Sequence, residues 1–214
     1  MMPLTLKMLR EMAMRLTQPS ESGLDKSSNR KQLYNYHSSL PKYNYDVGNS
    51  DFSVHKQTYD GNKTVMSTVD NKNKETVHHS AIIHTKANDR FPYDHQEQTM
   101  VERKENTGKG DLPKGHVLNL LHHHIGHSAL PLRSSSTQYG KGHDLWERLV
   151  HKSIDSGKHV YHWDGKSLHK TTKDNADAHL NKSFGPLNDN SYSDKHMIVS
   201  NESLEHKKEP KCLK

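Results

Sequence analysis

The sequence predicts a mostly irregular, disordered chain with two or three short α-helices and little regular sheet. Three observations predict this class: only 30% of the 214 residues are hydrophobic, 7% are aromatic, and the mean hydropathy is −1.06. Typical globular domains contain roughly 45–50% apolar residues. Because folding must offset about 1–2 kcal/mol of backbone entropy for each ordered residue, so small an apolar content favours a chain that becomes ordered on a partner.

The charge and the cysteine content narrow the class of partner and the compartment. Lysine and arginine number 31 against 25 acidic residues, a net charge of +6, which favours an acidic partner. The basic residues are not concentrated in one patch, so no specific nucleic acid is expected. The single cysteine, Cys212, cannot form an intramolecular disulfide and indicates a reducing, cytoplasmic compartment. No apolar run reaches the roughly 18–20 residues of a membrane span.

Residues 1–18 are expected to form an amphipathic N-terminal helix. Leu4, Met8 and Leu16 belong to one apolar stripe at helical spacing, and Pro19 would end the helix. Such a helix suits two roles, which the sequence leaves open. One is docking in an apolar groove of a partner, and the other is a mitochondrial presequence.

Residues 19–110 are expected to be an extended polar region. Valine and isoleucine recur between residues 64 and 85, but without the sustained alternation that a half-buried strand needs, so at best a strand edge is expected there. Phe91, Pro92 and Tyr93 form an elbow, because a residue before proline favours extended geometry. We expect the two aromatic side chains of this elbow to be surface anchors.

Residues 111–158 are expected to form a helical docking segment. A short helix is predicted over residues 116–126, and a second over 143–157, where Asp144 can cap the start and Gly157 the end. The apolar face of the first helix includes Leu118 and Leu121, and that of the second includes Trp146 and Leu149.

Residues 159–214 are expected to be a largely disordered tail. Within it, Asp164-Gly165 is a turn pair preceded by Val160, Tyr161 and Trp163, which predicts a small hairpin.

Catalytic motifs are not found in this sequence, so we expect no enzyme and no cofactor. The 19 histidines invite a metal hypothesis, since His123 and His127 would share a helix face and His116 lies seven residues before His123. A metal site needs three or four fixed ligands with supporting partners, and Gly126 interrupts this helix. We therefore assign no metal ligands, and keep a histidine-rich metal-binding protein as an alternative.

Two short motifs carry a family resemblance. "SSSTQYG" at residues 134–140, after a Leu-His-His stretch, and "NDRFPYDHQEQT" at residues 88–99 resemble motifs of small cilia- and flagella-associated proteins, the microtubule inner proteins of axonemes, including testis-expressed members. The resemblance implies a non-enzymatic structural protein of the cytoskeleton, in a cilium or flagellum, that orders on a protein assembly such as the tubulin polymer. No homo-oligomer is implied.

We expect the partner to be contacted by apolar and aromatic side chains. These candidate partner-binding residues are Phe91, Tyr93, Leu118, Leu121, Tyr139, Trp146 and Leu149. A mitochondrial accessory protein with an N-terminal presequence remains the second alternative.

Overall fold

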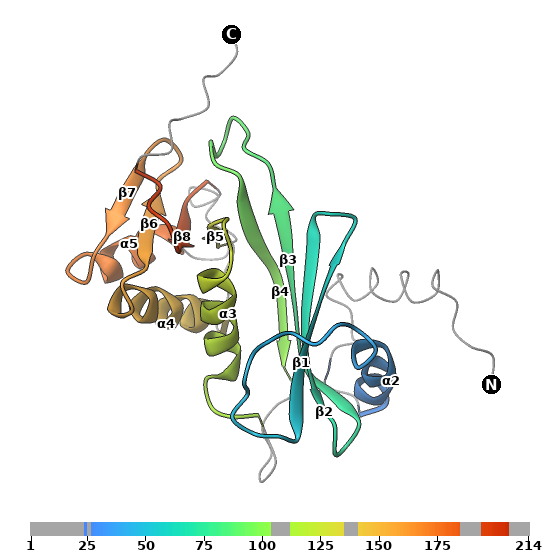
Figure 1. The fold of residues 1–214 in the computed structure, drawn as a ribbon. Helices are drawn as coiled ribbons and strands as arrows, with labels where there is room; N and C mark the ends of the chain where they lie inside the picture. Colours follow the sequence, from blue (N-terminus) through green and yellow to red (C-terminus); the bar gives the residue numbers. More distant parts are fainter. Residues whose placement is uncertain (1–23, 25–26, 104–111, 135–140, 185–193, 206–214) are drawn as a thin grey trace. The chain divides into compact units, whose positions relative to one another are not determined.

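The computed structural model describes residues 24, 27–103, 112–134, 141–184 and 194–205, and in this part of the chain it contains eight strands and four helices (Figure 1). The helices are α2 (Ser27–His37), α3 (His116–Gly126), α4 (Lys141–Asp155) and α5 (Ala176–Ser183). The strands are β1 (Phe52–Tyr59), β2 (Lys63–Asp70), β3 (Glu75–Thr85), β4 (His95–Arg103), β5 (Leu132–Arg133), β6 (His159–Trp163), β7 (Leu168–Thr171) and β8 (His196–Ser200).

The prediction of a mostly irregular chain with little regular sheet is therefore wrong. The eight strands hydrogen-bond in the order β1-β2-β3-β4-β5-β8-β6-β7, and the sheet is mixed because β4 and β5 run parallel while β1–β2, β5–β8, β6–β7 and β6–β8 are antiparallel. Strands β1 to β4 occupy the region expected to be extended and polar, and β6, β7, α5 and β8 occupy the expected tail.

The chain divides into two compact units. Unit 1 comprises Met1–Ile82 and Thr99–His116, and unit 2 comprises Ile83–Gln98 and Val117–Lys214.

Unit 1 is built on strands whose buried side chains are largely polar. β1 and β2 form an antiparallel hairpin from Phe52↔Asp70 to Tyr59↔Lys63. Asp60, Gly61 and Asn62 connect the strands, and Asp60 and Gly61 have positive φ (49° and 72°). Asp-Gly suits this turn because both residues must adopt left-handed geometry. Every residue of β2 after Lys63 is buried, although four of the seven are polar. The buried polar residues of β2 are Thr64, Ser67, Thr68 and Asp70.

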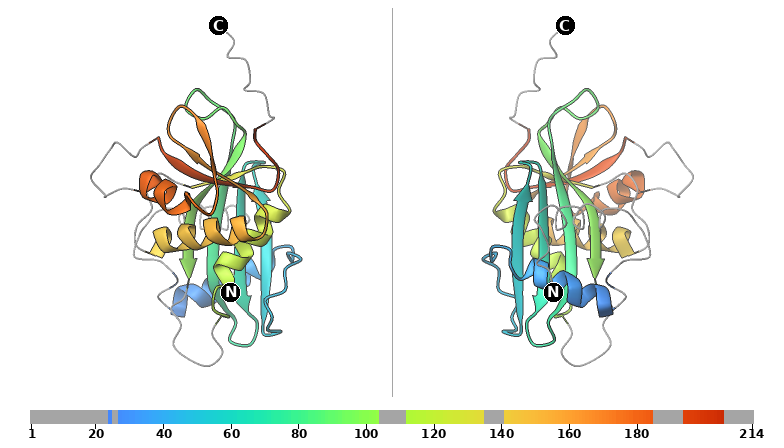
Figure 2. Two further views of the ribbon diagram at one scale, coloured as in Figure 1. Left: turned by 90° about the vertical axis from the view of Figure 1, so that its left-hand side faces the viewer. Right: turned by 90° about the vertical axis from the view of Figure 1, so that its right-hand side faces the viewer.

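In unit 2, two helices pack on the strands and form a hydrophobic core with them. β6 lies between β7 and β8, and α4 and α5 pack on β6 and β8 and lie side by side (Figure 2). Trp146 and Leu149 of α4 are fully buried, with 0% exposure. On β6 the side chains alternate, so Val160 and His162 share one face while Trp163 points to the other.

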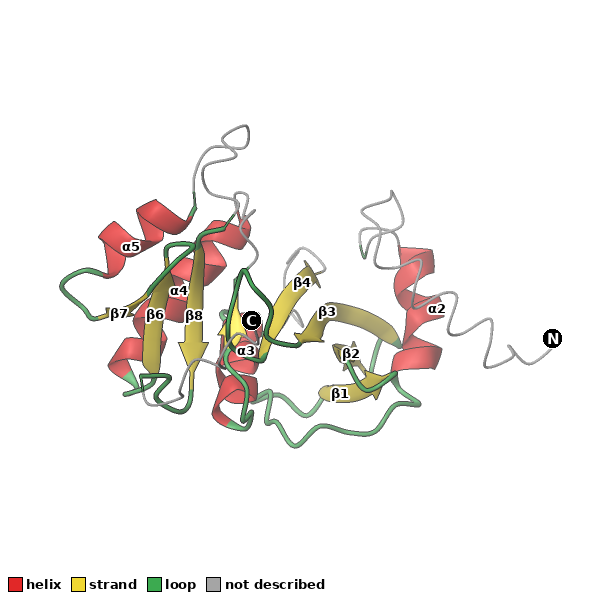
Figure 3. Cartoon of the chain, turned by 90° about the horizontal axis from the view of Figure 1, so that it is seen from above, coloured by secondary structure: helices red, strands yellow, loops and turns green. Residues whose placement is uncertain are grey.

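Three local predictions from the sequence are confirmed. The helix expected over residues 116–126 is α3, and the one expected over 143–157 is α4, shifted by two residues. The hairpin expected at Asp164-Gly165 joins β6 and β7, with Gly165 at φ +96° (Figure 3). The helix expected over residues 1–18 lies outside the described residues. Among those described, no helix has the length and apolar character needed to cross a membrane.

Candidate functional site

Three histidines gather where the β6–β7 hairpin meets α5. His162 of β6 pairs directly with His169 of β7, so their side chains project from the same face of the hairpin. Helix α5 adds His179. The ring centroids are 6.1 Å apart for His162 and His169, 5.1 Å for His162 and His179, and 6.5 Å for His169 and His179. We call these three residues the histidine trio.

Each ring of the trio is held through one nitrogen by an oxygen of the same unit. The pairs, each separated by 2.8 Å, are His162 Nδ1 with Ser183 Oγ, His169 Nε2 with Asp164 Oδ2, and His179 Nδ1 with Thr171 Oγ1. The second nitrogen of each ring makes no hydrogen bond to the described residues. This arrangement, with one ring nitrogen anchored and the other left over, is typical of histidines that bind metal ions.

The local sequence of the hairpin explains how Asp164 reaches His169. Oδ1 of Asp164 accepts hydrogen bonds from the backbone N–H groups of Lys166 and Ser167, at 2.8 Å each. Gly165, at φ +96°, allows the tight turn that brings these N–H groups back to the carboxylate. The other oxygen of Asp164 is thereby directed at the ring of His169.

Electrostatics keep two of the rings neutral. Burial, and then the neighbouring His179 and His169, lower the pKa of His162 to about 4. Burial lowers the pKa of His179 as well, followed by the positive charge of Lys182 and by His169. Burial opposes ionisation of Asp164, but hydrogen bonds from His169 and two backbone N–H groups outweigh it and hold its pKa below the usual range. At neutral pH the rings of His162 and His179 are therefore unprotonated, and the carboxylate of Asp164 is ionised.

The trio is open on one side. His162 is buried, His179 is half-buried and His169 is exposed. Zinc takes histidine nitrogens at about 2.0–2.1 Å in tetrahedral sites, which places those nitrogens roughly 3.3 Å from one another. The ring centroids of the trio lie 5.1 to 6.5 Å apart, and among the described residues it is His143, Asp144 and Glu147, and not the trio, whose donor atoms all lie within 4.8 Å of one another. The three rings of the trio must therefore approach one another to bind one ion.

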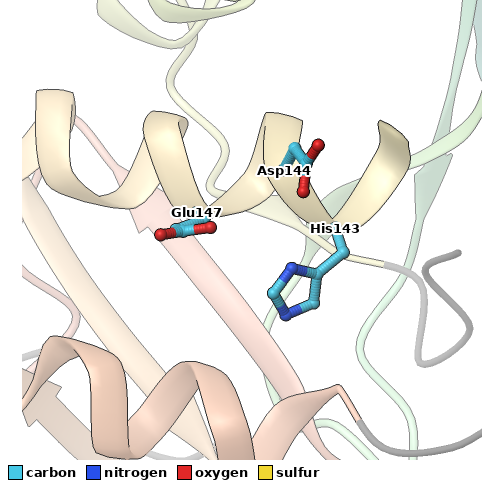
Figure 4. A group of neighbouring side chains, drawn as sticks. All are labelled: His143, Asp144 and Glu147. Carbon is cyan, nitrogen blue, oxygen red and sulfur yellow. The ribbon is translucent and has the colours of Figure 1, made fainter. Parts of the chain in front are cut away.

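A second group of potential ligands lies on α4. His143, Asp144 and Glu147 have donor atoms that all lie within 4.8 Å of one another (Figure 4). The acidic pair is exposed, and Asp144 stands in the first turn of α4, where a negative charge is favoured by the helix dipole. The ring of His143 meets the ring of Phe184 edge-on at 5.4 Å. Helix stability alone thus accounts for Asp144.

Most of the predicted partner-binding residues belong to the core of unit 2. Phe91, Leu121, Trp146 and Leu149 are at most 1% exposed. Tyr93 and Leu118 are half-buried, and Tyr139 lies outside the described residues. The structure does not bring these residues together as one surface, and a partner could contact the buried ones only after displacing their neighbours.

Phe91 is the fully buried residue of the elbow. Its ring meets Trp163 edge-on at 5.3 Å and His95 at 4.8 Å, and the guanidinium carbon of Arg133 lies 5.4 Å from it. The same aromatic residue that looked like a surface anchor therefore covers one face of the sheet.

Sequence reasoning missed the trio, although one signal pointed to it. The Asp164-Gly165 turn was recognised, but a two-residue loop there would pair Trp163 with Lys166. The actual connection covers residues 164–167, so Trp163 pairs with Leu168 and His162 with His169. The side-chain hydrogen bonds of Asp164 select the longer loop.

No protein-family model, curated protein or solved structure matches this chain. Its function is therefore argued from the geometry of the site.

Proposed function

We propose that this chain binds a divalent transition-metal ion, with zinc as the reference ion, through His162, His169 and His179. The observation that carries the proposal is that three elements of unit 2 each contribute one imidazole, that the ring centroids lie within 6.5 Å of one another, and that each ring is anchored at 2.8 Å by an oxygen. Imidazole nitrogen is a preferred ligand of zinc, copper and nickel. Three histidines and one open position form a coordination set used by zinc.

The oxygen partners support this proposal over a purely structural role. A buried histidine that only fills a core needs its polar atoms satisfied, and the hydroxyl group of Ser183 meets that need at Nδ1 of His162. His169 is exposed, where water satisfies an imidazole without a fixed partner, yet it is held by Asp164. Anchoring an exposed ring costs side-chain entropy, which is offset if its orientation serves a ligand.

Zinc titration of the full chain by calorimetry tests the proposal. We expect one stoichiometric site above the weak background of a chain with 19 histidines. His169→Gln and His179→Gln each remove one ligand at a partly exposed position, so the fold is retained and the affinity falls by at least about tenfold. Cobalt substitution adds a visible absorption band that reports tetrahedral coordination.

Substitutions on α4 provide the matched control. His143→Gln and Glu147→Gln remove potential ligands from the second group while leaving the trio intact. If these variants lose the stoichiometric site and His169→Gln keeps it, the metal lies on α4 and the proposal for the trio is wrong. Absence of any stoichiometric site in the unmodified chain would also overturn it.

Docking on axonemal microtubules stays a prediction that rests on the resemblance at residues 88–99 and 134–140. Co-sedimentation of the full chain with polymerised tubulin tests it directly. The mitochondrial alternative depends on residues 1–18, and sequencing the N-terminus of the mature protein tests that.

A further inference from the structure

We propose that Asp164 selects the tautomer of His169 and thereby makes Nδ1 of His169 its metal-binding atom. This inference rests on the metal site proposed above, and it assigns Asp164 as a positioning residue that touches the ligand without touching the ion. The juxtaposition behind it is the 2.8 Å contact between Oδ2 of Asp164 and Nε2 of His169.

The chemistry of the two groups decides where the proton lies. An ionised carboxylate can only accept a hydrogen bond, so the nitrogen facing it must carry a hydrogen. A neutral imidazole has a single N–H group. When Nε2 of His169 donates to Asp164, Nδ1 is left with its lone pair, which is the form that binds a metal ion.

The turn keeps Asp164 from rotating away. Its Oδ1 receives the N–H groups of Lys166 and Ser167, so only Oδ2 is available to His169. The two oxygens thus have separate tasks, one in the hairpin and one at the site. Because the carboxylate is fixed by backbone atoms of the same loop, its orientation does not depend on a bound ion.

The other two members of the trio have partners that do not choose a tautomer. Ser183 and Thr171 face His162 and His179 with hydroxyl groups, which can donate or accept. Their Nδ1 atoms are engaged, so Nε2 is the atom left for a metal. The inferred ligand set is therefore Nε2 of His162, Nε2 of His179 and Nδ1 of His169.

Asp164→Asn is the substitution that isolates this role. The asparagine carbonyl can replace Oδ1 in the turn, which places the amide NH2 group against Nε2 of His169. An NH2 group donates, so Nε2 must accept and the proton moves to Nδ1. The hairpin is retained while the metal-binding lone pair is lost, the same logic by which an Asp-to-Asn change forces the wrong tautomer in a Ser-His-Asp triad.

The first measurement needs no metal. Long-range proton–nitrogen correlation spectra of the metal-free chain distinguish Nδ1–H from Nε2–H imidazoles. We expect His169 to be Nε2–H in the unmodified chain and Nδ1–H in Asp164→Asn. A His169 that is Nδ1–H in the unmodified chain would overturn the inference, and this holds even if the variant does not fold.

The second measurement is zinc affinity. We expect Asp164→Asn to bind zinc about 10- to 100-fold more weakly, the usual cost of losing a ligand's outer partner. The matched control is Asp177→Asn, because Asp177 also faces a histidine, His151, at 3.1 Å but outside the trio. We expect this variant to keep its zinc affinity.

The outcomes separate the two proposals. If the unmodified chain binds zinc through His169 and His179 and Asp164→Asn binds equally well, tautomer selection by Asp164 is wrong while the metal site stands. If the unmodified chain has no stoichiometric zinc site, the metal site itself is wrong, and the ligand set inferred here falls with it.

Discussion

Two groups of histidines in this protein have similar partners and opposite surroundings. In unit 1, His37 and His79 stack with ring centroids 5.1 Å apart, and both are buried. In unit 2, the trio gathers at similar ring distances, but His169 is exposed and His179 half-buried. Both rings of unit 1 are held by hydroxyl oxygens, as are His162 and His179 of the trio, so a hydroxyl partner does not by itself separate the two groups.

Access to solvent is what separates a histidine that builds the fold from one that can bind a ligand. His37 Nδ1 lies 3.0 Å from Thr76 Oγ1, and His79 Nδ1 lies 3.2 Å from Ser67 Oγ. Burial, and then the Coulombic effect of neighbouring histidines, lower the pKa of His37 well below its usual value. Burial and then Lys63 lower that of His79 to about 4. An ion cannot reach these rings, so unit 1 uses histidine as a neutral core residue.

The largest expected effect concerns the core beneath the trio. Trp146→Ala removes a fully buried indole from α4, and we expect it to lower the free energy of unfolding by about 3–5 kcal/mol. Urea titration followed by circular dichroism measures this loss. The exposed neighbour Arg148→Ala is the control, with a change within about 0.5 kcal/mol. An unchanged spectrum and midpoint for Trp146→Ala would mean that unit 2 does not rest on this core.

Acid should destabilise unit 1 through His79. Burial lowers the pKa of folded His79 to about 4 from the ordinary value of 6.5, so folding disfavours protonation. The penalty is absent above pH 6.5 and grows as the pH falls to about 4, where it reaches about 3 kcal/mol.

Urea midpoints at pH 7.5 and pH 4.5 test this effect. His79→Gln should show a smaller loss between the two conditions than the unmodified chain, because glutamine does not titrate. Equal losses in the two proteins would contradict the assignment of His79 as a neutral core residue.

Zinc should distinguish the two units directly. An ion in hundredfold excess over its dissociation constant stabilises the binding form by about 2.7 kcal/mol. Hydrogen exchange should therefore slow at the amides of β6, β7 and α5 and stay unchanged in β1 and β2. Slowing in β1 and β2 alone would place the binding site in unit 1 and reverse the comparison.

The smallest change in stability is expected at the exposed pair of His151 and Asp177. His151 faces Asp177, whose side chain is 82% exposed. We expect His151→Gln to change the free energy of unfolding by less than about 0.5 kcal/mol, because solvent screens such pairs. Zinc affinity should stay at the unmodified value, and a tenfold loss on calorimetry would extend the site beyond the trio.

Elements defined by near neighbours were predictable from the sequence. Helix α3 ends at Gly126 as expected, α4 carries its apolar stripe at Trp146 and Leu149, and Asp164-Gly165 turns the chain between β6 and β7. Caps, stops and turn pairs act over a few residues, so their physical effect is present before any tertiary contact forms.

The sequence did not predict the sheet because many of the side chains that are buried in its strands are polar. In β2 and β3, serine, threonine and histidine occupy positions that aliphatic residues usually take, as in Thr68, His78 and His79. A hydropathy count treats each of these as a cost. Tertiary structure removes that cost by pairing hydroxyl groups with imidazoles and, at His79, by a burial that lowers the pKa and keeps the ring neutral.

Local sequence patterns were sufficient to predict helices α3 and α4 and the hairpin turn, and the composition showed the abundance of histidine. Which histidines are core residues and which can bind an ion depends on contacts between residues far apart in the sequence. The reason is physical: His79 and His169 are the same side chain, and their burial and their partners across the sheet or the turn determine whether the ring has an accessible lone pair.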